Sequence, residues 1–424
     1  MKIVMKIQHR IICIIITFSM LCLVFINQSY ALSGIKVHFI NVGSGDGILI
    51  ECHGETALID GGYVSQWAQY GDEDDPQDPL LNDVDRAFEK VADDSYKTKT
   101  EEEKNDIALE IKEVLQQNRH NEVVDYLDQL GIQKIDILIS THPHQDHIGG
   151  LLSVICNFPI GKIYKSKLEY STRYALTFDR LIQMDEHLKS VTSVPQENEQ
   201  FRLGGDNGAV FTVLNDTSAD YHGSADNSNG DTNNYSLVLR MDYGQRSFLF
   251  TGDSQRTSQA YILENHENQV QVDILKQPHH GYANPDGFID ANHSGHYAFT
   301  SAVNANITVV SCGPSTPHPK VVNDMANSDV YQTKDLGTIV MASDGDRIEI
   351  SYGNKLVYAF VKGDLNGDGQ ITPADYVMIR RQILGTYTLK GNACWTGDIN
   401  GDGQITPADY VMVRRHILGT YTIQ

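Results

Sequence analysis

The sequence predicts a mixed α/β domain followed by a small all-α module. Over residues 32–360, short β-rich runs alternate with helical runs, which is typical of α/β and α+β domains. Residues 361–424 contain a tandem repeat in which each copy places a polar loop before a helical pattern. The length of 424 residues fits two or three domains. With 41% hydrophobic residues the chain can fill a core, so wholesale disorder is excluded.

Individual elements follow from apolar runs and their boundaries. Each expected strand is rich in β-branched residues and is bounded by turn residues. Helices are expected at Glu101–Gln117 and Val123–Leu130, where apolar residues recur at helical spacing. The expected strands are Ile35–Val42, Gly47–Glu51, Ala57–Asp60, Ile135–Ser140, Val210–Leu214, Ser236–Met241, Ser247–Thr251, Val272–Lys276 and Ile307–Ser311.

Residues 64–118 have the composition of an insertion into this domain. They contain an acidic run at 72–75 and a highly charged run at 97–104. Charge runs usually mark solvated faces, so we expect a mostly helical excursion into solvent. The alternative is a lid over a functional site.

The first 31 residues are expected to be a secretory signal peptide. Lys2, Lys6 and Arg10 precede an uncharged apolar run from Ile11 to Ile26, and residues 29–31 match a small-x-small cleavage site. The apolar run is short for a membrane-spanning helix. We therefore expect an extracellular protein, secreted or part of a cell-surface complex, with no membrane segment after cleavage. The remaining cysteines are expected to be buried free thiols: Cys52, Cys156, Cys312 and Cys394.

The charge balance limits the partners that the protein can have. With 33 Lys+Arg and 55 Asp+Glu, the formal net charge is −22. An acidic surface repels the phosphate backbone, which argues against a broad groove for nucleic acid. Bound cations reverse the local potential, so a metal site that handles a phosphate group stays open. Nucleic acid is expected only as a substrate.

Two polar loops in the tandem repeat have the spacing of calcium ligands. Residues 363–388 recur as 397–422, and three of the 26 positions differ. Oxygen-bearing residues occupy positions 1, 3, 5, 7, 9 and 12 of each loop, with glycine at position 6, which is EF-hand spacing with Asp in place of Glu at position 12. We expect two Ca²⁺ ions, and no helix leading into either loop. The expected ligands are Asp364, Asn366, Asp368, Gln370, Thr372 and Asp375, then Asp398, Asn400, Asp402, Gln404, Thr406 and Asp409.

These loop–helix units resemble a type I dockerin domain over residues 363–424. The resemblance implies binding to a cohesin module of a scaffold protein, two-fold pseudo-symmetry, and a place in a polysaccharide-degrading complex such as a cellulosome. The chain departs from many dockerins in having Pro-Ala at loop positions 10 and 11. The alternative is a calcium-stabilised terminal module with no partner. The charged partner contacts are expected to be Arg380, Arg381, Arg414 and Arg415.

A dense group of metal-ligand residue types follows the strand Ile135–Ser140. His142, His144, Asp146 and His147 lie within six residues. Imidazole with carboxylate suits Zn²⁺, and also Mn²⁺ or iron, and such clusters rarely serve packing. Other strands are also followed by histidine or aspartate, and active sites are commonly assembled in this way at one edge of a sheet. These residues are Asp60, Asp253, His279, His280 and His318.

Together these stretches resemble the metallo-β-lactamase superfamily, in particular its ComEC-type branch. The resemblance covers about 35–345 and implies an αββα sandwich with two metals at one edge. The HH pair and the insertion after DGG are also similar to bacterial phosphorylcholine esterases of the superfamily. The matching segments are HFINVGSGDGILIE with ALIDGG, STHPHQDHIGG, NNYSLVLRMDYGQRSFLFTGD, VDILKQPHHG and VVSCGPSTPHPK.

The resemblance implies a role for each residue of this set. His142 and His144 bind the first metal, Asp146, His147 and His280 bind the second, and Asp253 bridges both. Asp60 orients a ligand histidine. Asp146 also orients the attacking hydroxide, His279 holds the phosphate, and His318 is a general acid or phosphate clamp.

The third histidine of the first metal site has no counterpart in this chain. Residues 227–234 contain none, Asn233 stands where the motif begins, and His222 is nearby but out of register. The first metal is therefore expected to be looser.

The bridging carboxylate favours phosphodiester chemistry over β-lactam hydrolysis. The expected enzyme is a phosphodiesterase or nuclease that uses a metal-activated hydroxide, with two Zn²⁺ or Mn²⁺ ions. A lactone or other ester is the alternative substrate. The opposing class is a non-catalytic binding module with a calcium arm.

Overall fold

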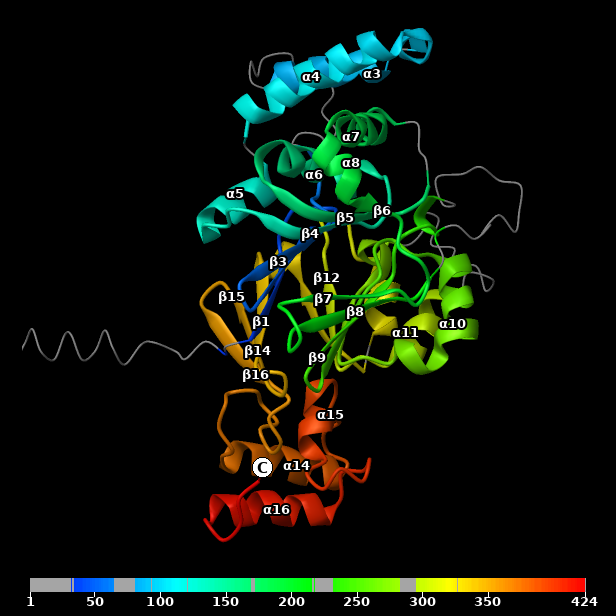
Figure 1. The fold of residues 1–424 in the computed structure, drawn as a ribbon. Helices are drawn as coiled ribbons and strands as arrows, with labels where there is room; N and C mark the ends of the chain where they lie inside the picture. Colours follow the sequence, from blue (N-terminus) through cyan, green and yellow to red (C-terminus); the bar gives the residue numbers. More distant parts are fainter. Residues whose placement is uncertain are drawn as a thin grey trace, which may run out of the picture.

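Two β-sheets packed face to face form the centre of the larger domain (Figure 1). The nine-stranded sheet has the order β16-β15-β14-β1-β2-β3-β4-β5-β6, and the seven-stranded sheet has the order β13-β12-β11-β10-β9-β8-β7. The structure is a computed structural model that describes residues 32, 34–64, 81–92, 94–119, 121–168, 172–215, 217, 232–282, 295–325 and 327–423. The expected signal peptide and His222 lie outside these ranges.

The strands are β1 (Ile35–Phe39), β2 (Ile48–Cys52), β3 (Glu55–Ile59), β4 (Ile135–Ser140), β5 (Ile160–Lys165), β6 (Thr192–Ser193), β7 (Gln200–Leu203), β8 (Ala209–Val213), β9 (Leu239–Tyr243), β10 (Arg246–Phe250), β11 (Ile274–Lys276), β12 (Ile307–Val310), β13 (Asp329–Gln332), β14 (Ile339–Ser343), β15 (Ile348–Tyr352) and β16 (Lys355–Ala359). The helices are α3 (Leu81–Ala92), η1 (Asp94–Thr98), α4 (Glu101–Gln117), α5 (Glu122–Leu130), α6 (Gln145–Asn157), α7 (Arg173–Met184), α8 (Glu186–Val191), α10 (Arg256–Val270), η2 (Pro278–Gly281), α11 (Gly295–Val303), α12 (Pro319–Asp324), α13 (Thr333–Leu336), α14 (Pro373–Ile383), α15 (Asn392–Gly397) and α16 (Pro407–Ile417).

Side-chain alternation explains the layered architecture. On β2, Ile48 and Ile50 belong to the core between the two sheets, whereas Leu49 belongs to the core beneath α3–α7. On the other side, Leu249 and Leu275 pack with α10 and α11. Helices therefore cover the outer face of each sheet, and the expected αββα sandwich is confirmed.

Residues 65–80 of the expected insertion, with the acidic run 72–75, lie outside the described ranges, and its described helices α3 and α4 are not an excursion into solvent. Phe88 of α3 and Ile111 of α4 are buried in the same core as helices α6 and α7. The ring of Phe88 lies 4.9 Å from that of Tyr174, centroid to centroid. The buried residues of α4 recur at helical spacing, and α3 and α4 pack on the outside of α6 and α7 (Figure 1).

Element bounds agree with the sequence within a few residues where strands are buried. Ile135–Ser140 and Glu101–Gln117 match the expected bounds. The expected strands do not include β5–β7, and they end at Ser311, so β13–β16 were missed as well. β13 is half-buried throughout, and the first two residues of β16 are exposed, which weakens an apolar signal.

The C-terminal module follows β16 directly. Tyr358 N of β16 donates to Gly367 O of the first calcium loop at 3.0 Å. Arg246 lies over the rings of Phe360 and Trp395, at 4.4 and 5.4 Å from their centroids. The module is therefore packed against the end of the sandwich (Figure 1).

In the described ranges, no helix combines the length and the apolar character that crossing a membrane requires. Cys52, Cys156 and Cys312 are buried free thiols as expected, whereas Cys394 is exposed, because it lies on the outer face of the short helix α15. The expectation was wrong for Cys394 alone.

Candidate metal centre

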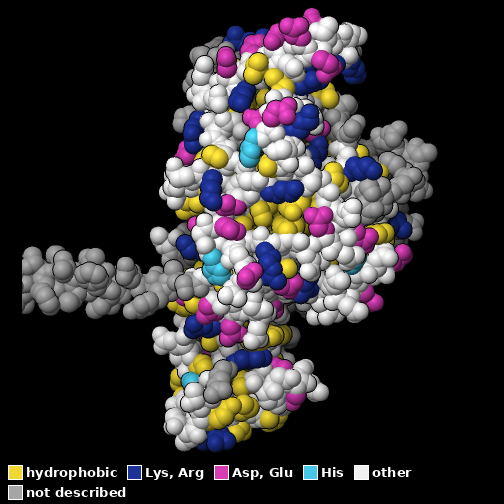
Figure 2. Space-filling model, in the orientation of Figure 1, with side chains coloured by type: hydrophobic (Ala, Val, Ile, Leu, Met, Phe, Trp, Pro, Cys, Tyr) yellow, Lys and Arg dark blue, Asp and Glu magenta, His cyan; other side chains and the backbone are white. Residues whose placement is uncertain are grey.

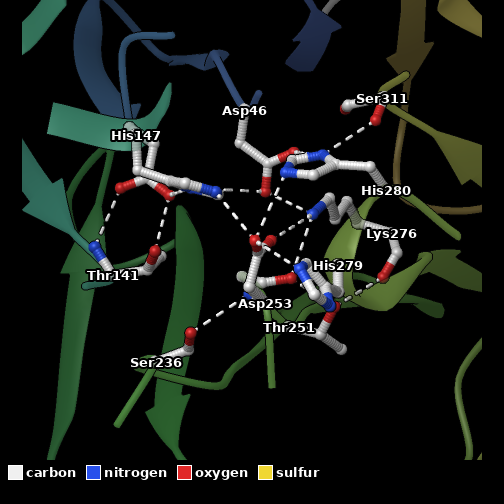
Figure 3. Close-up of polar contacts among 12 residues, drawn as sticks. Asp46, Thr141, His147, Ser236, Thr251, Asp253, Lys276, His279, His280 and Ser311 are labelled. Carbon is white, nitrogen blue, oxygen red and sulfur yellow. Dashed lines mark hydrogen bonds and ion pairs between the residues drawn. The ribbon is translucent and has the colours of Figure 1, made fainter. Parts of the chain in front are cut away.

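Four side chains converge at the edge where strand ends of the two sheets meet. Asp146, His147, Asp253 and His280 each offer one ligand atom, and all these atoms lie within 4.8 Å of one another. Oδ2 of Asp253 lies 3.2 Å from His147 Nε2 and 3.3 Å from His280 Nε2. His280 Nε2 lies 3.4 Å from Oδ2 of Asp146. This second metal position is drawn in part in Figure 3.

The backbone delivers these groups through short turns. Asp146 and His147 lie in the first turn of α6, which begins just after β4. Asp253 follows β10, and His280 lies in η2 just after β11. Asp60, His279 and His280 have φ of 56°, 47° and 52°. Left-handed backbone at non-glycine residues is strained and clusters at functional sites.

The far side of each ligand histidine is fixed by a hydrogen-bond partner. His147 Nδ1 lies 2.7 Å from Oδ2 of Asp60, whose Oδ1 accepts from Thr141 N at 2.8 Å. His280 Nδ1 donates to Ser311 O at 3.0 Å. The Nε2 atoms of both histidines then face the cluster, buried and without a hydrogen bond to the described residues. Such orphaned donors fit a metal ion.

Opposite charges shift the pKa values of this cluster. Burial opposes the charged form of Asp146, but His147 and His280 outweigh it and hold its pKa at about 2. The same histidines and His279 hold the pKa of Asp253 well below its usual value against burial. Burial lowers the pKa of His280, but Asp253 and Asp146 raise it to about 9. With both carboxylates ionised, the cluster favours a positive charge at its centre.

The first metal position is wider. His142 Nε2 lies 3.0 Å from His144 Nδ1 and 3.9 Å from Oδ2 of Asp253. Burial lowers the pKa of both histidines, which keeps them neutral, as metal ligands must be. Within the described residues, these donors do not join Asp253 in a set as compact as the second.

His279 faces this first position. Its Nε2 lies 3.7 Å from Oδ2 of Asp253 and 3.4 Å from Asn233 Nδ2. Its Nδ1 lies 3.1 Å from Gln255 Nε2. Asn233 also hydrogen-bonds His144. Asn233 therefore lies between two histidines of the first position.

His318 is not brought into the cluster. It is the N-cap of α12, and its Nδ1 accepts from Lys320 N at 3.2 Å. Its backbone N donates to Gly281 O at 2.9 Å, so it lies beside the HHG turn. Among the described residues, its side chain has no hydrogen bond or ion pair to the metal ligands.

Two charged residues of the site were missed from the sequence. Asp46 and Lys276 form a buried ion pair, and Oδ1 of Asp46 lies 3.6 Å from His280 Nδ1 (Figure 3). Asp46 stands in the loop SGDG, and Lys276 ends an apolar strand. A lysine inside such a strand was the available signal, because buried lysine needs a partner.

Hydrogen bonds within the two polar loops of the C-terminal module hold their first aspartates in place. Asp364 Oδ2 accepts from Gly369 N at 2.7 Å, and Asp398 Oδ2 accepts from Gly403 N at 2.9 Å. Thr372 and Thr406 cap α14 and α16 in capping boxes with Asp375 and Asp409. The oxygen-rich donor set fits Ca²⁺.

One expectation for this module was wrong. The helix α15 (Asn392–Gly397) runs directly into the second loop, where no entering helix was expected. This helix has six residues after its N-cap Gly391, which is too short to give a clear periodic signal. The four arginines expected at the partner surface are exposed: Arg380, Arg381, Arg414 and Arg415.

Comparison with known proteins agrees with this architecture. The metallo-beta-lactamase superfamily profile matches residues 106–305, and the dockerin type I domain profile matches residues 362–418. ComE operon protein 3 of Bacillus subtilis is 25% identical over 231 residues, which are 51% of this chain and 26% of that protein. The chain thus spans about a quarter of that relative.

Two solved structures are also similar. The metallo-beta-lactamase fold protein YhfI from Bacillus subtilis is 14% identical, with a TM-score of 0.39, over 73% of this chain and 99% of that one. A ScaB dockerin bound to the third ScaC cohesin of Acetivibrio cellulolyticus is 31% identical, with a TM-score of 0.15, over 15% of this chain and 89% of that one. From the profiles, the fold and the clustered ligands together, the chain carries a metallo-β-lactamase superfamily domain, similar to the ComEC-type branch, followed by a C-terminal type I dockerin domain.

Proposed function

We propose that the protein is a metal-dependent hydrolase of phosphodiesters that its dockerin domain attaches to a cohesin-bearing scaffold outside the cell. The main support for hydrolase activity is that ligand atoms of Asp146, His147, Asp253 and His280 lie within 4.8 Å of one another. Two carboxylates and two imidazoles around one point make a ligand set for Zn²⁺ or Mn²⁺.

Two cations fit the two positions. The second would be held by Asp146, His147, Asp253 and His280, and the first by His142, His144 and Asp253. We add His279 to the first set, because its Nε2 faces Oδ2 of Asp253 at 3.7 Å. His279 then supplies the third nitrogen, in place of the histidine that residues 227–234 lack.

The chemistry divides between the cations and the chain. Bound cations supply Lewis acidity and lower the pKa of a water ligand toward neutrality. Asp146 stays ionised at neutral pH, because its pKa is about 2, and accepts a hydrogen bond from the attacking water. Its side chain is 19% exposed, whereas Asp253 is 2% exposed, so Asp146 meets solvent and Asp253 does not.

A phosphodiester fits these charges best. Two bound cations would neutralise the oxygens of an anionic phosphate, and with Asp146 and Asp253 as the carboxylate ligands they would keep a net positive charge. The formal charge of −22 repels long nucleic acid, so short or non-nucleic diesters are the favoured substrates.

The test is hydrolysis of bis-p-nitrophenyl phosphate by residues 32–424. The protein is stripped of metal and then reloaded with Zn²⁺ or Mn²⁺. We expect reloading to restore activity, and Asp146→Ala and Asp253→Ala to abolish it. Asp242→Ala, a half-exposed carboxylate paired with Arg240, is the matched control and keeps full activity. Two bound metals without activity would indicate a lactone or another ester, and no bound metal would leave a binding module.

The dockerin function rests on the duplicated surface of the C-terminal module. The two copies expose the same apolar residues, Val377 with Val411, Leu384 with Leu418, and Tyr387 with Tyr421. Figure 2 shows hydrophobic side chains gathered on the visible face of this module. Exposed apolar residues with arginines around them are typical of a protein–protein interface.

Calcium-dependent binding of a cohesin tests this part. We expect residues 32–424 to bind a type I cohesin with calcium present and to lose binding in EGTA. Changing Leu384 and Leu418 together to Asp should abolish binding. Leu109→Asp, at a half-exposed leucine of α4, should leave it unchanged. Unchanged binding by the double variant would move the partner surface elsewhere.

A further inference from the structure

A lysine lies inside the metal centre, where no ligand role requires it. Lys276 ends β11, and its side chain is fully buried between the two sheets. A charge in such a place persists only with partners. Lys276 pairs with Asp46, donates to Gly252 O at 3.0 Å, and lies 3.9 Å from Oδ1 of Asp253 (Figure 3).

These contacts converge on the turn that carries Asp253. Gly252 O accepts from both Lys276 Nζ and His279 N, the latter at 3.2 Å. Thr251 Oγ1 donates to Lys276 O at 2.8 Å, and Asp253 N donates to Ser236 Oγ at 3.1 Å. The turn 251–253 is thus held from both neighbouring strands, and Lys276 supplies two of its contacts.

The two oxygens of Asp253 have different surroundings. Oδ2 faces the Nε2 atoms of His147 and His280 at 3.2 and 3.3 Å. Oδ1 is buried, makes no hydrogen bond to a described residue, and faces Lys276 Nζ. The ammonium on one side and the imidazoles on the other define which oxygen points to the metals.

We propose that Lys276, held in place by Asp46, is a positioning residue that fixes the turn at Gly252 and turns Oδ2 of Asp253 toward both metal positions. This inference rests on the proposed metal-dependent function. Asp46 is its anchor, because it holds the ammonium and also stands behind His280. The pair then sets the affinity of the centre for cations without touching them.

The competing explanation is that Asp46 and Lys276 only neutralise each other in the core. Three variants separate the two: Lys276→Met, Asp46→Asn and the double variant. Each is measured for Zn²⁺ affinity by chelator competition, for bound metal by mass spectrometry, and for the melting temperature of the metal-free protein. Lys90→Met, at a half-exposed lysine paired with Glu110, is the matched control.

The double variant removes both charges and leaves no unpaired one, so it should melt near the wild-type temperature. We nevertheless expect its Zn²⁺ affinity to stay ten- to a hundredfold below wild type, as for other groups that orient ligands. Wild-type affinity in the double variant would overturn the positioning role, and so would unchanged affinity in Lys276→Met. A wild-type protein that binds no metal would overturn the proposed function itself.

Discussion

At the scale of single residues, the metal centre depends on groups that hold the ligands as much as on the ligands. Asp60 is fully buried and bonds His147 Nδ1 at 2.7 Å, while burial raises its pKa against the opposing effect of His147. Its left-handed φ of 56° aims the carboxylate back at the loop after β4. The orientation of His147 therefore depends on a residue that bonds its Nδ1 atom, on the side of the ring away from Asp253.

Asp60→Asn tests this dependence. Asn adopts left-handed backbone readily, so the fold should persist, but the amide can present nitrogen to His147 and favours the wrong tautomer. We expect metal affinity to fall ten- to a hundredfold, measured by chelator competition. Asp136→Asn, in the partly exposed pair with Lys134, should leave metal affinity unchanged. Equal affinities would show that His147 needs no acceptor behind it.

His279→Gln tests the added ligand of the first position. Loss of its Nε2 leaves two nitrogens and one shared carboxylate there, so we expect one tightly bound metal instead of two. Metal per chain by mass spectrometry measures this. His266→Gln, at a buried histidine paired with Glu197, is the control and should keep two metals. Two metals in His279→Gln would return His279 to a substrate-binding role.

The clustering of Asp146 and His147 with Asp253 and His280 could be predicted from the sequence, because HxHxDH after a strand is compact and rarely structural. Lys276 carried a signal, as a lysine in an apolar strand, but its pairing with Asp46 could not be predicted, because the two residues are 230 positions apart. For His318 the structure adds that it caps α12 and lies beside the HHG turn, and its expected role as general acid or phosphate clamp stays a prediction.

At the scale of elements, α3 and α4 belong to the core of the domain. Phe88 is fully buried against Tyr174 of α7, and Ile111 is buried beside it in the same cluster. Thr100 and Glu103 form a capping box that fixes the start of α4. A segment with this much buried apolar surface cannot open and close as a lid without losing it.

Phe88→Ala should therefore destabilise the whole domain. Removing a buried phenylalanine costs about 3–5 kcal/mol, because the cavity left behind relaxes only in part. Urea denaturation of the metal-loaded protein measures it. Leu109→Ala, at a half-exposed position of α4, should cost under about 0.5 kcal/mol. A neutral Phe88→Ala with altered substrate affinity would restore the lid interpretation.

The charged runs misled the sequence analysis here because charge and burial alternate around a helix. The lysines and glutamates of α4 face solvent, and its few buried residues recur at helical spacing. Several buried strands were predicted, such as β2, β4 and β10, whereas the buried strand β14 was not. The edge strands β13 and β16 were missed because they are only partly buried, which weakens their apolar signal.

At the scale of the whole molecule, near-identical repeats become unequal. The first loop packs on β16, where Gly367 and Gly369 lie against Tyr358, whereas nothing lies within 4 Å of a Cβ built on Gly401 or Gly403. Asp364 is 1% exposed. The sequence predicts two equivalent calcium sites, and only the fold distinguishes them.

Asp364→Ala should lower the melting temperature more than Asp398→Ala does, measured at saturating calcium by calorimetry. Loss of the first site releases Tyr358 and the edge of the nine-stranded sheet, and loss of the second leaves that contact intact. Equal decreases in melting temperature would show that calcium binding in the first loop does not stabilise the sandwich.

Trp395 should hold the two domains together. Its ring stacks over Lys362, whose Nζ lies 3.7 Å from the centroid and donates to Asp398 O at 2.6 Å. Trp395→Ala should therefore expose the connection, and trypsin should cleave after Lys362 at least tenfold faster. Tyr387→Ala, at an exposed ring, should leave the rate unchanged. Equal cleavage in both would mean that other contacts suffice.

The short connection between β16 and the first loop also limits how far the larger domain can move relative to the C-terminal module. A flexible linker of 20 residues would let a catalytic domain move over about 25 Å and rotate freely. Here Phe360, Lys362 and Trp395 leave no such tether. When the C-terminal module is anchored, the larger domain therefore keeps one orientation and one distance relative to it. The metal centre then reaches only substrate that lies in that direction and at that distance.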